Sequence, residues 1–178
     1  MLANSIGNGL AFFFVWLFAV AALHKMRSPA YYQRLIASYG NVARVGRLLV
    51  FLVFLVAVCE LSVALLVLLP TTRTAGFAGG AMLLLAYAAM MAWQYLRGHS
   101  DLACGCAGPE SALTVGPALI IRNLVCACLA LPAMALAKTL PASPGGAAIA
   151  LTVAFIAIFF YVCSDLLIAN AQAMNQDV

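Results

Sequence analysis

Long apolar stretches separated by short polar segments run through the whole chain. Five of these stretches are long enough to cross a bilayer, because a helix rises about 1.5 Å per residue and needs roughly 20 apolar residues to span the hydrocarbon. We expect transmembrane helices over residues 9–24, 48–69, 76–96, 115–137 and 147–169. The pattern therefore predicts an all-α integral membrane protein, a bundle of about five transmembrane helices in one domain spanning residues 1–178.

A shorter amphipathic segment lies between the first two predicted crossings. Ser28 and Pro29 are typical of a helix start, with proline in the first turn. Apolar and aromatic side chains then recur at helical spacing, at Tyr31, Tyr32, Leu35, Ile36 and Tyr39. We expect a short interfacial helix over residues 29–40, with its tyrosines at the level of the lipid headgroups. An ordinary polar connector is the alternative.

The composition agrees with a membrane location. Of 178 residues, 66% are hydrophobic and only 8% are charged, and the mean hydropathy is +1.09. Soluble domains contain about 25% charged residues. The net charge of +4 does not indicate nucleic-acid binding, because five of the nine Lys and Arg residues lie between residues 24 and 47. Lipid headgroups and membrane topology account for that cluster. Residues 1–8 contain no Lys or Arg, so we expect the first apolar run to remain as a helix.

The polar segment 97–113 carries two thiols, Cys104 and Cys106, on either side of Gly105. An extended chain holds such cysteines up to about 7 Å apart at Cα, whereas a disulfide needs about 4.4–6.8 Å. Gly105 gives the backbone the freedom to bend. The resulting small ring would be strained and easily exchanged. This loop therefore favours thiol–disulfide exchange by Cys104 and Cys106 over a structural crosslink, which normally closes a longer loop.

Four further cysteines lie inside apolar runs, where cysteine commonly packs as a small hydrophobic side chain: Cys59, Cys126, Cys128 and Cys163. Cys126 is singled out because it lies one helical turn after Arg122, and it could act as a third, resolving thiol. Two Cys-x-Cys pairs could instead supply four sulfur ligands to a metal ion. A helix points Cys126 and Cys128 in different directions, so we expect no metal site.

Several charged side chains near the thiols are supporting candidates. The thiolate is the reactive form of cysteine, and Arg97, His99 and Arg122 could each stabilise it. Asp101 and Glu110 would act in the opposite direction.

Two charged residues lie inside predicted crossings. Glu60 is near the middle of its crossing, where a carboxyl group is costly to bury and usually finds a partner. Arg122 lies one to two turns inside the fourth crossing. Its side chain could extend to the interface, pair with Glu60, or, with Glu60, bind a ligand such as the head group of a quinone. The sequence leaves these alternatives open.

The chain resembles the methylamine utilisation protein MauE family, which belongs with the DoxX-like membrane proteins. The resemblance rests on Asp101 to Gly108 (DLACGCAG), on Arg122-Asn123-Leu124, and on Glu60 in the second crossing. It covers most of the chain. One departure is Ala107, where the family pattern more often has an aromatic residue.

This resemblance implies a role in maturing the β subunit of methylamine dehydrogenase, a disulfide-rich periplasmic subunit with a tryptophan-derived quinone cofactor. It also implies a thioredoxin-like periplasmic partner, MauD, and a part in processing, export or disulfide formation. Cys104 and Cys106 would be the exchanging pair. The residues themselves and the resemblance together give six supporting candidates: Arg122, Glu60, Asn123, Cys126, His99 and Asp101.

Two other functional classes compete with thiol–disulfide exchange. A non-catalytic assembly scaffold or export factor would use the Cys-Gly-Cys segment only to shape a partner-binding loop. A solute transporter is disfavoured, because no predicted crossing is interrupted by Gly or Pro at mid-depth apart from Pro132, late in the fourth crossing.

Two features of the sequence give opposite predictions for the orientation of the protein in the membrane. The basic connector between residues 24 and 47 would be cytoplasmic by the positive-inside rule, and the thiol loop, two crossings later, would share its side. Disulfide chemistry for an exported subunit needs the opposite face. Charges held in an interfacial helix do not form a free loop. We therefore expect a multi-pass protein of the bacterial inner membrane with a periplasmic thiol loop.

Overall fold

The computed structural model describes residues 2–39, 46–100, 102–105, 108, 111, 113–137, 139 and 143–176. These residues form six helices: α1 (Leu2–Arg27), α2 (Pro29–Tyr39), α3 (Gly46–Leu68), α4 (Arg73–Leu96), α5 (Pro117–Leu136) and α6 (Pro144–Gln176). All except α2 are long and apolar enough to cross a membrane. The predicted fold class, an all-α membrane protein with about five crossings and one short helix, is confirmed.

Two helices are longer than the apolar runs that predicted them. α1 begins at Leu2 rather than near residue 9, and α6 continues to Gln176 rather than ending near residue 169. Polar side chains extend both helices because they find partners in the fold. Asn8 Nδ2 donates to the carbonyl oxygens of Asn4 (2.7 Å) and Thr139 (2.8 Å). The other four helices begin and end within three residues of the predicted bounds.

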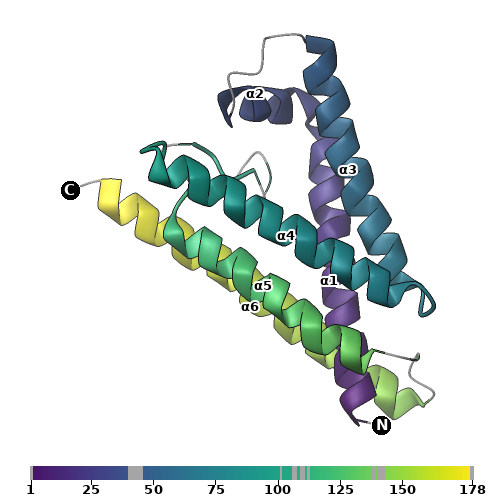
Figure 1. The fold of residues 1–178 in the computed structure, drawn as a ribbon. Coiled ribbons are helices and arrows are strands. Elements are labelled where there is room, and N and C mark those ends of the chain that lie inside the picture. The colour runs from purple at the N-terminus through teal and green to yellow at the C-terminus, as the bar shows by residue number, and fades with distance from the viewer. Residues whose placement is uncertain are drawn as a thin grey trace.

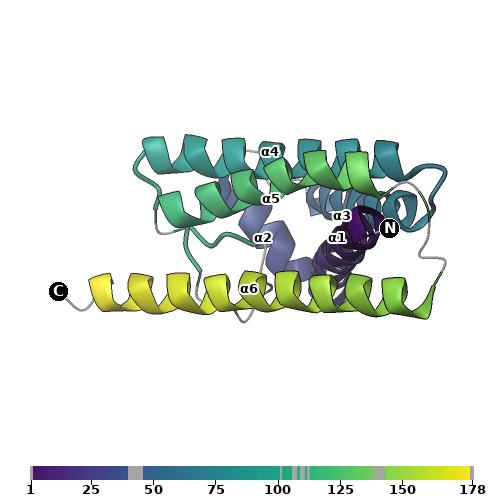
Figure 2. The ribbon, with the colours of Figure 1, turned by 90° about the horizontal axis from the view of Figure 1, so that it is seen from below.

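The helices form two groups, one of α1, α2 and α3 and the other of α4, α5 and α6. The two groups diverge from the end of the molecule where the N-terminus lies (Figure 1). α1 and α3 pack along each other, and α4 packs along α5. Figure 2 shows α6 on the opposite side of the molecule from α4 and α5, and α1 contacts both α5 and α6. The short helix α2 packs against α3 near the open end. The two groups are farthest apart at the end that carries α2 (Figure 1).

A buried arginine closes the opposite end of the bundle. Arg73, the first residue of α4, is only 2% exposed. Its guanidinium donates to the carbonyl oxygen of Val67 (2.9 Å) and to Asn8 Oδ1 (2.9 Å), and it also contacts the carbonyl oxygen of Ala137. The last carbonyls of a helix have no partner within that helix. Arg73 therefore supplies donors to the ends of α3 and α5 and joins them to α1.

Aromatic rings and small residues fill the core near this closed end. The ring of Phe14 is fully buried and meets that of Phe77 edge-on, with centroids 5.4 Å apart. Gly76 brings α4 against α3 so closely that a Cβ atom there would lie 2.5 Å from the backbone nitrogen of Val67. Small residues permit this approach between membrane helices. The tight packing holds the two groups together at one end and lets them separate at the other.

Candidate functional site

The chain around Cys104 folds into a short hairpin. The Cys104 amide donates to the Leu113 carbonyl (2.9 Å), and the Val115 amide donates to the Leu102 carbonyl (2.8 Å). This pairing is a single antiparallel bridge between Ala103 and Thr114. The hairpin brings Cys104, which follows α4, beside residues that precede α5.

Two helices hold the hairpin in place. The Tyr39 hydroxyl of α2 donates to the Ala103 carbonyl (2.8 Å). On α6, the Gln172 side chain accepts from the Thr114 amide (3.0 Å) and donates to the Thr114 carbonyl (2.8 Å). The contact with α2 shows that the basic connector and the thiol loop share one side of the bundle. The contacts of Gln172 lie in the polar C-terminal part of α6, beyond the predicted end of that helix at residue 169.

Cys104 is buried beneath this hairpin. Its side chain is 6% exposed and packs with Met91, Leu113, Val115 and Leu119. The Cys104 Sγ lies 3.5 Å from the Met91 sulfur. Burial raises the pKa of Tyr31 on α2 above its usual value, and the charge of a Cys104 thiolate adds to that shift. Tyr31 is therefore a neutral hydroxyl at physiological pH.

Gly105 reverses the chain immediately after Cys104. Its φ of +72° lies in the left-handed region, which glycine enters without the steric cost that a Cβ atom brings. A Cβ atom at this position would also collide with the Leu35 side chain of α2. Gly105 therefore turns the chain directly after Cys104, in a conformation that a residue with a Cβ atom would adopt only under strain. Cys106 and Asp101, two of the predicted site residues, lie outside the described residues.

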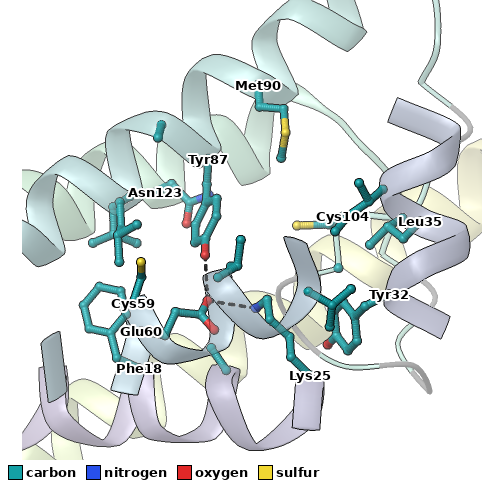
Figure 3. Close-up of a pocket in the computed structure, with 18 of the residues that line it drawn as sticks. Phe18, Lys25, Tyr32, Leu35, Cys59, Glu60, Tyr87, Met90, Cys104 and Asn123 are labelled. Atoms are coloured by element: carbon teal, nitrogen blue, oxygen red, sulfur yellow. Dashed lines mark hydrogen bonds and ion pairs between the residues drawn. The ribbon is translucent and has the colours of Figure 1, made fainter. Parts of the chain in front are cut away.

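A cavity of about 440 Å³ lies between the two groups of helices. α1, α2, α3 and α4 supply most of its walls, and Cys104 and Gly105 line it from the hairpin. Most of the lining side chains are apolar or aromatic. Figure 3 shows the Cys104 sulfur and the Glu60 carboxylate directed into the same space. The structure therefore brings a thiol and a buried carboxylate to one apolar chamber.

Glu60 is fully buried and is held by two donors from other helices. Its Oε1 accepts from Lys25 Nζ on α1 (2.8 Å) and from the Tyr87 hydroxyl on α4 (2.7 Å) (Figure 3). Lys25 Nζ also lies 5.2 Å from the centre of the Tyr32 ring. Glu60 Oε2 has no hydrogen-bond partner among the residues that the structure describes. One carboxylate oxygen is thus available to a further donor.

The partner of Glu60 differs from the one considered at the sequence level. Arg122 forms an ion pair with Asp165 of α6, and its guanidinium carbon lies 4.6 Å from the centre of the Tyr161 ring. It therefore joins α5 to α6, and the pairing with Glu60 is wrong. Lys25 belongs to the basic cluster between residues 24 and 47, yet it is 8% exposed and its ammonium lies against Glu60 inside the bundle. A buried carboxylate in a membrane helix usually pairs with an oppositely charged side chain, and that tendency is the signal that could have identified Lys25.

Asn123 is the predicted supporting residue that reaches the cavity from α5. Its side chain is 2% exposed and lines the cavity wall. Its Nδ2 has no hydrogen-bond partner within the described ranges. Tyr87 also lines the cavity and was not singled out from the sequence. It is a hydroxyl-bearing residue within an apolar run, which is the signal that could have found it.

The remaining predicted residues lie elsewhere. His99 is exposed, with Nδ1 3.2 Å from Gln94 Oε1, and Arg97 stacks on the Trp93 ring. Cys126 is buried in the main apolar core, whereas Cys104 belongs to the separate cluster around Leu119. Leu119 and Cys126 are seven residues apart on α5, or about 10 Å of helical rise. The structure does not bring Cys126 to Cys104.

The second Cys-x-Cys pair diverges, as expected for positions two apart on a helix. Cys126 is buried and Cys128 is exposed. Among the described residues, no three His, Cys, Asp or Glu side chains are grouped as metal ligands would be.

Comparison with known proteins gives two matches. The family model for "Methylamine utilisation protein MauE" matches residues 3–137. The methylamine utilization protein MauE of Paracoccus denitrificans is 32% identical over 170 residues, which cover 94% of this chain and 90% of that protein. No solved structure matches the chain significantly.

Proposed function

The chain belongs to the methylamine utilisation protein MauE family, and on this premise we propose that it is a membrane thiol–disulfide exchange component. The described part of the chain contains five helices able to cross a membrane, and membership of the family implies a role in methylamine utilisation. Its target is the β subunit of methylamine dehydrogenase, which it helps to mature. The exchange passes through a thioredoxin-like, MauD-like periplasmic partner, and Cys104 and Cys106 are the exchanging pair.

The observation that carries the proposal is the bend at Gly105 beside a buried Cys104. A disulfide between residues 104 and 106 needs a backbone bend that brings the two Cα atoms within about 4.4–6.8 Å, and the left-handed φ of +72° at Gly105 supports such a bend. A partner thiolate attacks one sulfur of this disulfide and forms a mixed disulfide. The partner's second thiolate then attacks the partner's own sulfur in the mixed disulfide, and the cysteine of this chain leaves as a thiolate. The partner is oxidised to a disulfide, and Cys104 and Cys106 are reduced to thiols, so two electrons move in each exchange.

The burial of Cys104 suggests which sulfur meets the partner. Attack by a protein thiol needs access to the sulfur, and Cys104 is only 6% exposed beneath the hairpin. We therefore assign Cys106 as the cysteine that meets the partner, and Cys104 as the cysteine on the cavity side.

The proposed orientation places the thiol loop on the periplasmic face of the inner membrane. Exchange for an exported subunit requires that face, since the cytoplasm keeps thiols reduced. Lys25, one of the five basic residues between residues 24 and 47, is paired with Glu60 inside the bundle. Its charge therefore does not count as a free loop charge under the positive-inside rule.

A trapping experiment tests the exchange. Exchange is reversible, so in a Cys104→Ser variant the Cys106 thiolate can still attack the disulfide of an oxidised partner. The mixed disulfide that forms has no thiol at position 104 to resolve it, so it should accumulate in cells growing on methylamine. The complex is recovered after acid quenching and alkylation, and mass spectrometry identifies the attached peptide. A Cys128→Ser variant is the control, because Cys128 is exposed on another helix face. The absence of any trapped protein in both Cys104→Ser and Cys106→Ser would contradict the proposal.

A further inference from the structure

The cavity contains two buried polar atoms that have no partner in the described part of the chain. Glu60 Oε2 is an acceptor and Asn123 Nδ2 is a donor, and the two side chains are 0% and 2% exposed. Buried polar groups are normally hydrogen-bonded, because an unpaired one carries its full desolvation cost. Both residues line the same cavity. A molecule with an oxygen for Asn123 and a hydroxyl for Glu60 would satisfy both.

The walls indicate that this molecule comes from the bilayer. A volume of about 440 Å³ lies within the usual range for small-molecule sites, about 300–1,000 Å³. Leu55 and Cys59 of α3 and Met90 of α4 line the cavity and are themselves exposed rather than buried. The cavity therefore opens between α3 and α4. An apolar molecule could enter sideways from the membrane and keep a hydrocarbon tail outside.

The position of Cys104 indicates what this molecule does. The Cys104 sulfur faces the cavity from the hairpin, opposite the Glu60 carboxylate (Figure 3). A dithiol that passes its disulfide to a partner must be reoxidised by an electron acceptor. We infer that the cavity binds the ring of a lipid-soluble quinone, which reoxidises Cys104 and Cys106. The inference rests on the proposed exchange function and names its electron acceptor.

The reaction balances with the quinone as sole oxidant. The thiols of Cys104 and Cys106 form a disulfide and lose two electrons and two protons. The quinone gains both electrons and both protons, and its two carbonyl oxygens become hydroxyls. In the ion pair with Lys25, Glu60 is a carboxylate, so its Oε2 can accept from a quinol hydroxyl. Asn123 Nδ2 can donate to an oxygen of either form.

The same polar atoms argue against a simple lipid chain. An alkyl chain would fill the apolar walls but would leave Glu60 Oε2 and Asn123 Nδ2 unpaired. A ring with oxygens is therefore distinguished from hydrocarbon by these two contacts. Decylubiquinone and decylbenzene make this comparison, because both have a six-membered ring and the same tail but only the first has oxygens.

The binding test uses the purified full-length protein in detergent. Decylubiquinone should raise its thermal unfolding temperature saturably, and decylbenzene should bind about tenfold more weakly or worse. Asn123→Leu should remove most of the rise caused by decylubiquinone. It should also raise the unfolding temperature of the ligand-free protein, because a buried unpaired amide is lost. A purely structural Asn123 would not give these opposite changes. Val125→Ala, on the exposed face of α5, is the control. Equal binding of both probes would overturn the inference.

The redox test separates this inference from the exchange function. Anaerobic protein with reduced thiols is mixed with decylubiquinone, and one quinol should form for each Cys104–Cys106 pair oxidised. A Cys104→Ser/Cys106→Ser variant should bind the quinone without forming quinol. Quinone binding to wild type without thiol oxidation would overturn the assignment of the acceptor. Absence of binding, with a partner still trapped on Cys106 in cells, would overturn this inference and leave the exchange function supported. Absence of both would refute both.

Discussion

The ammonium of Lys25 lies 2.8 Å from the carboxylate of Glu60, so the last turn of α1 is joined to the interior of α3 within the bundle. Both side chains are at least nine-tenths buried. Removing one member of such a pair leaves an uncompensated charge in an apolar setting, whereas replacing both with apolar residues is often neutral. Each charge can therefore be buried in its helix only because the other charge lies beside it.

This pair leads to a prediction about stability. Lys25→Met and Glu60→Met should each lower the free energy of unfolding by about 3–5 kcal/mol. The double variant should recover most of that loss. Detergent unfolding followed by tryptophan fluorescence gives the three values. Val58→Met, which lies on the exposed face of α3, controls for the added methionine. If the double variant were as unstable as the less stable single variant, the ion pair would not be the source of the effect.

The two thiols lead to a prediction about function. A Cys104→Ser/Cys106→Ser variant should reach the membrane at normal levels but should abolish maturation of the methylamine dehydrogenase β subunit. Serine keeps the size of each side chain and removes the exchangeable sulfur. Dye-linked methylamine dehydrogenase activity and a β-subunit blot measure the outcome, with Cys128→Ser as the control. Normal maturation in the double variant would favour the non-catalytic scaffold instead.

Gly105 leads to a prediction about access to Cys104. Gly105→Ala forces a residue with a Cβ atom into the left-handed region, at a cost of about 1–2 kcal/mol, and directs that atom at Leu35. The hairpin should separate from α2, and N-ethylmaleimide should modify Cys104 faster. Mass spectrometry of the Cys104 peptide measures the rate.

Gly145→Ala is the matched control for this variant, because a Cβ atom there meets nothing within 4 Å. Adding Leu35→Ala to Gly105→Ala should slow the labelling only in part, since it relieves the collision but not the backbone strain. If Leu35→Ala returned the labelling of Cys104 to the wild-type rate, the collision with Leu35 alone, without backbone strain, would account for the faster labelling.

The orientation of the bundle leads to a labelling prediction. With the native cysteines replaced, Ser100→Cys at the exposed thiol end should react with a membrane-impermeant maleimide in intact cells once the outer membrane is permeabilised. Thr71→Cys, exposed in the turn between α3 and α4, lies at the opposite end and should react only after lysis. The reverse pattern would place the thiol loop in the cytoplasm and would exclude disulfide formation for an exported subunit.

Much of the fold could be predicted from the amino-acid sequence because the signals are local. Whether a segment such as 48–69 crosses a membrane depends on the summed transfer free energy of its own residues. The start of α2 at Pro29 and the divergence of Cys126 from Cys128 also follow from neighbours along the chain. The turn at Gly105 belongs to the same class, because glycine enters the left-handed region more readily than any other residue.

The candidate site depended on contacts between distant residues. The sequence shows that Glu60 and Arg122 are costly to bury, but it does not show that Lys25 meets the first and Asp165 the second. These pairings depend on how the helices cross and how far the two groups diverge. They also depend on which face each helix turns inward. Glu60, Asn123 and Cys104 share one cavity for the same reason. Local hydrophobicity thus determined the crossings, and only the packing of helices far apart in the chain decided the site.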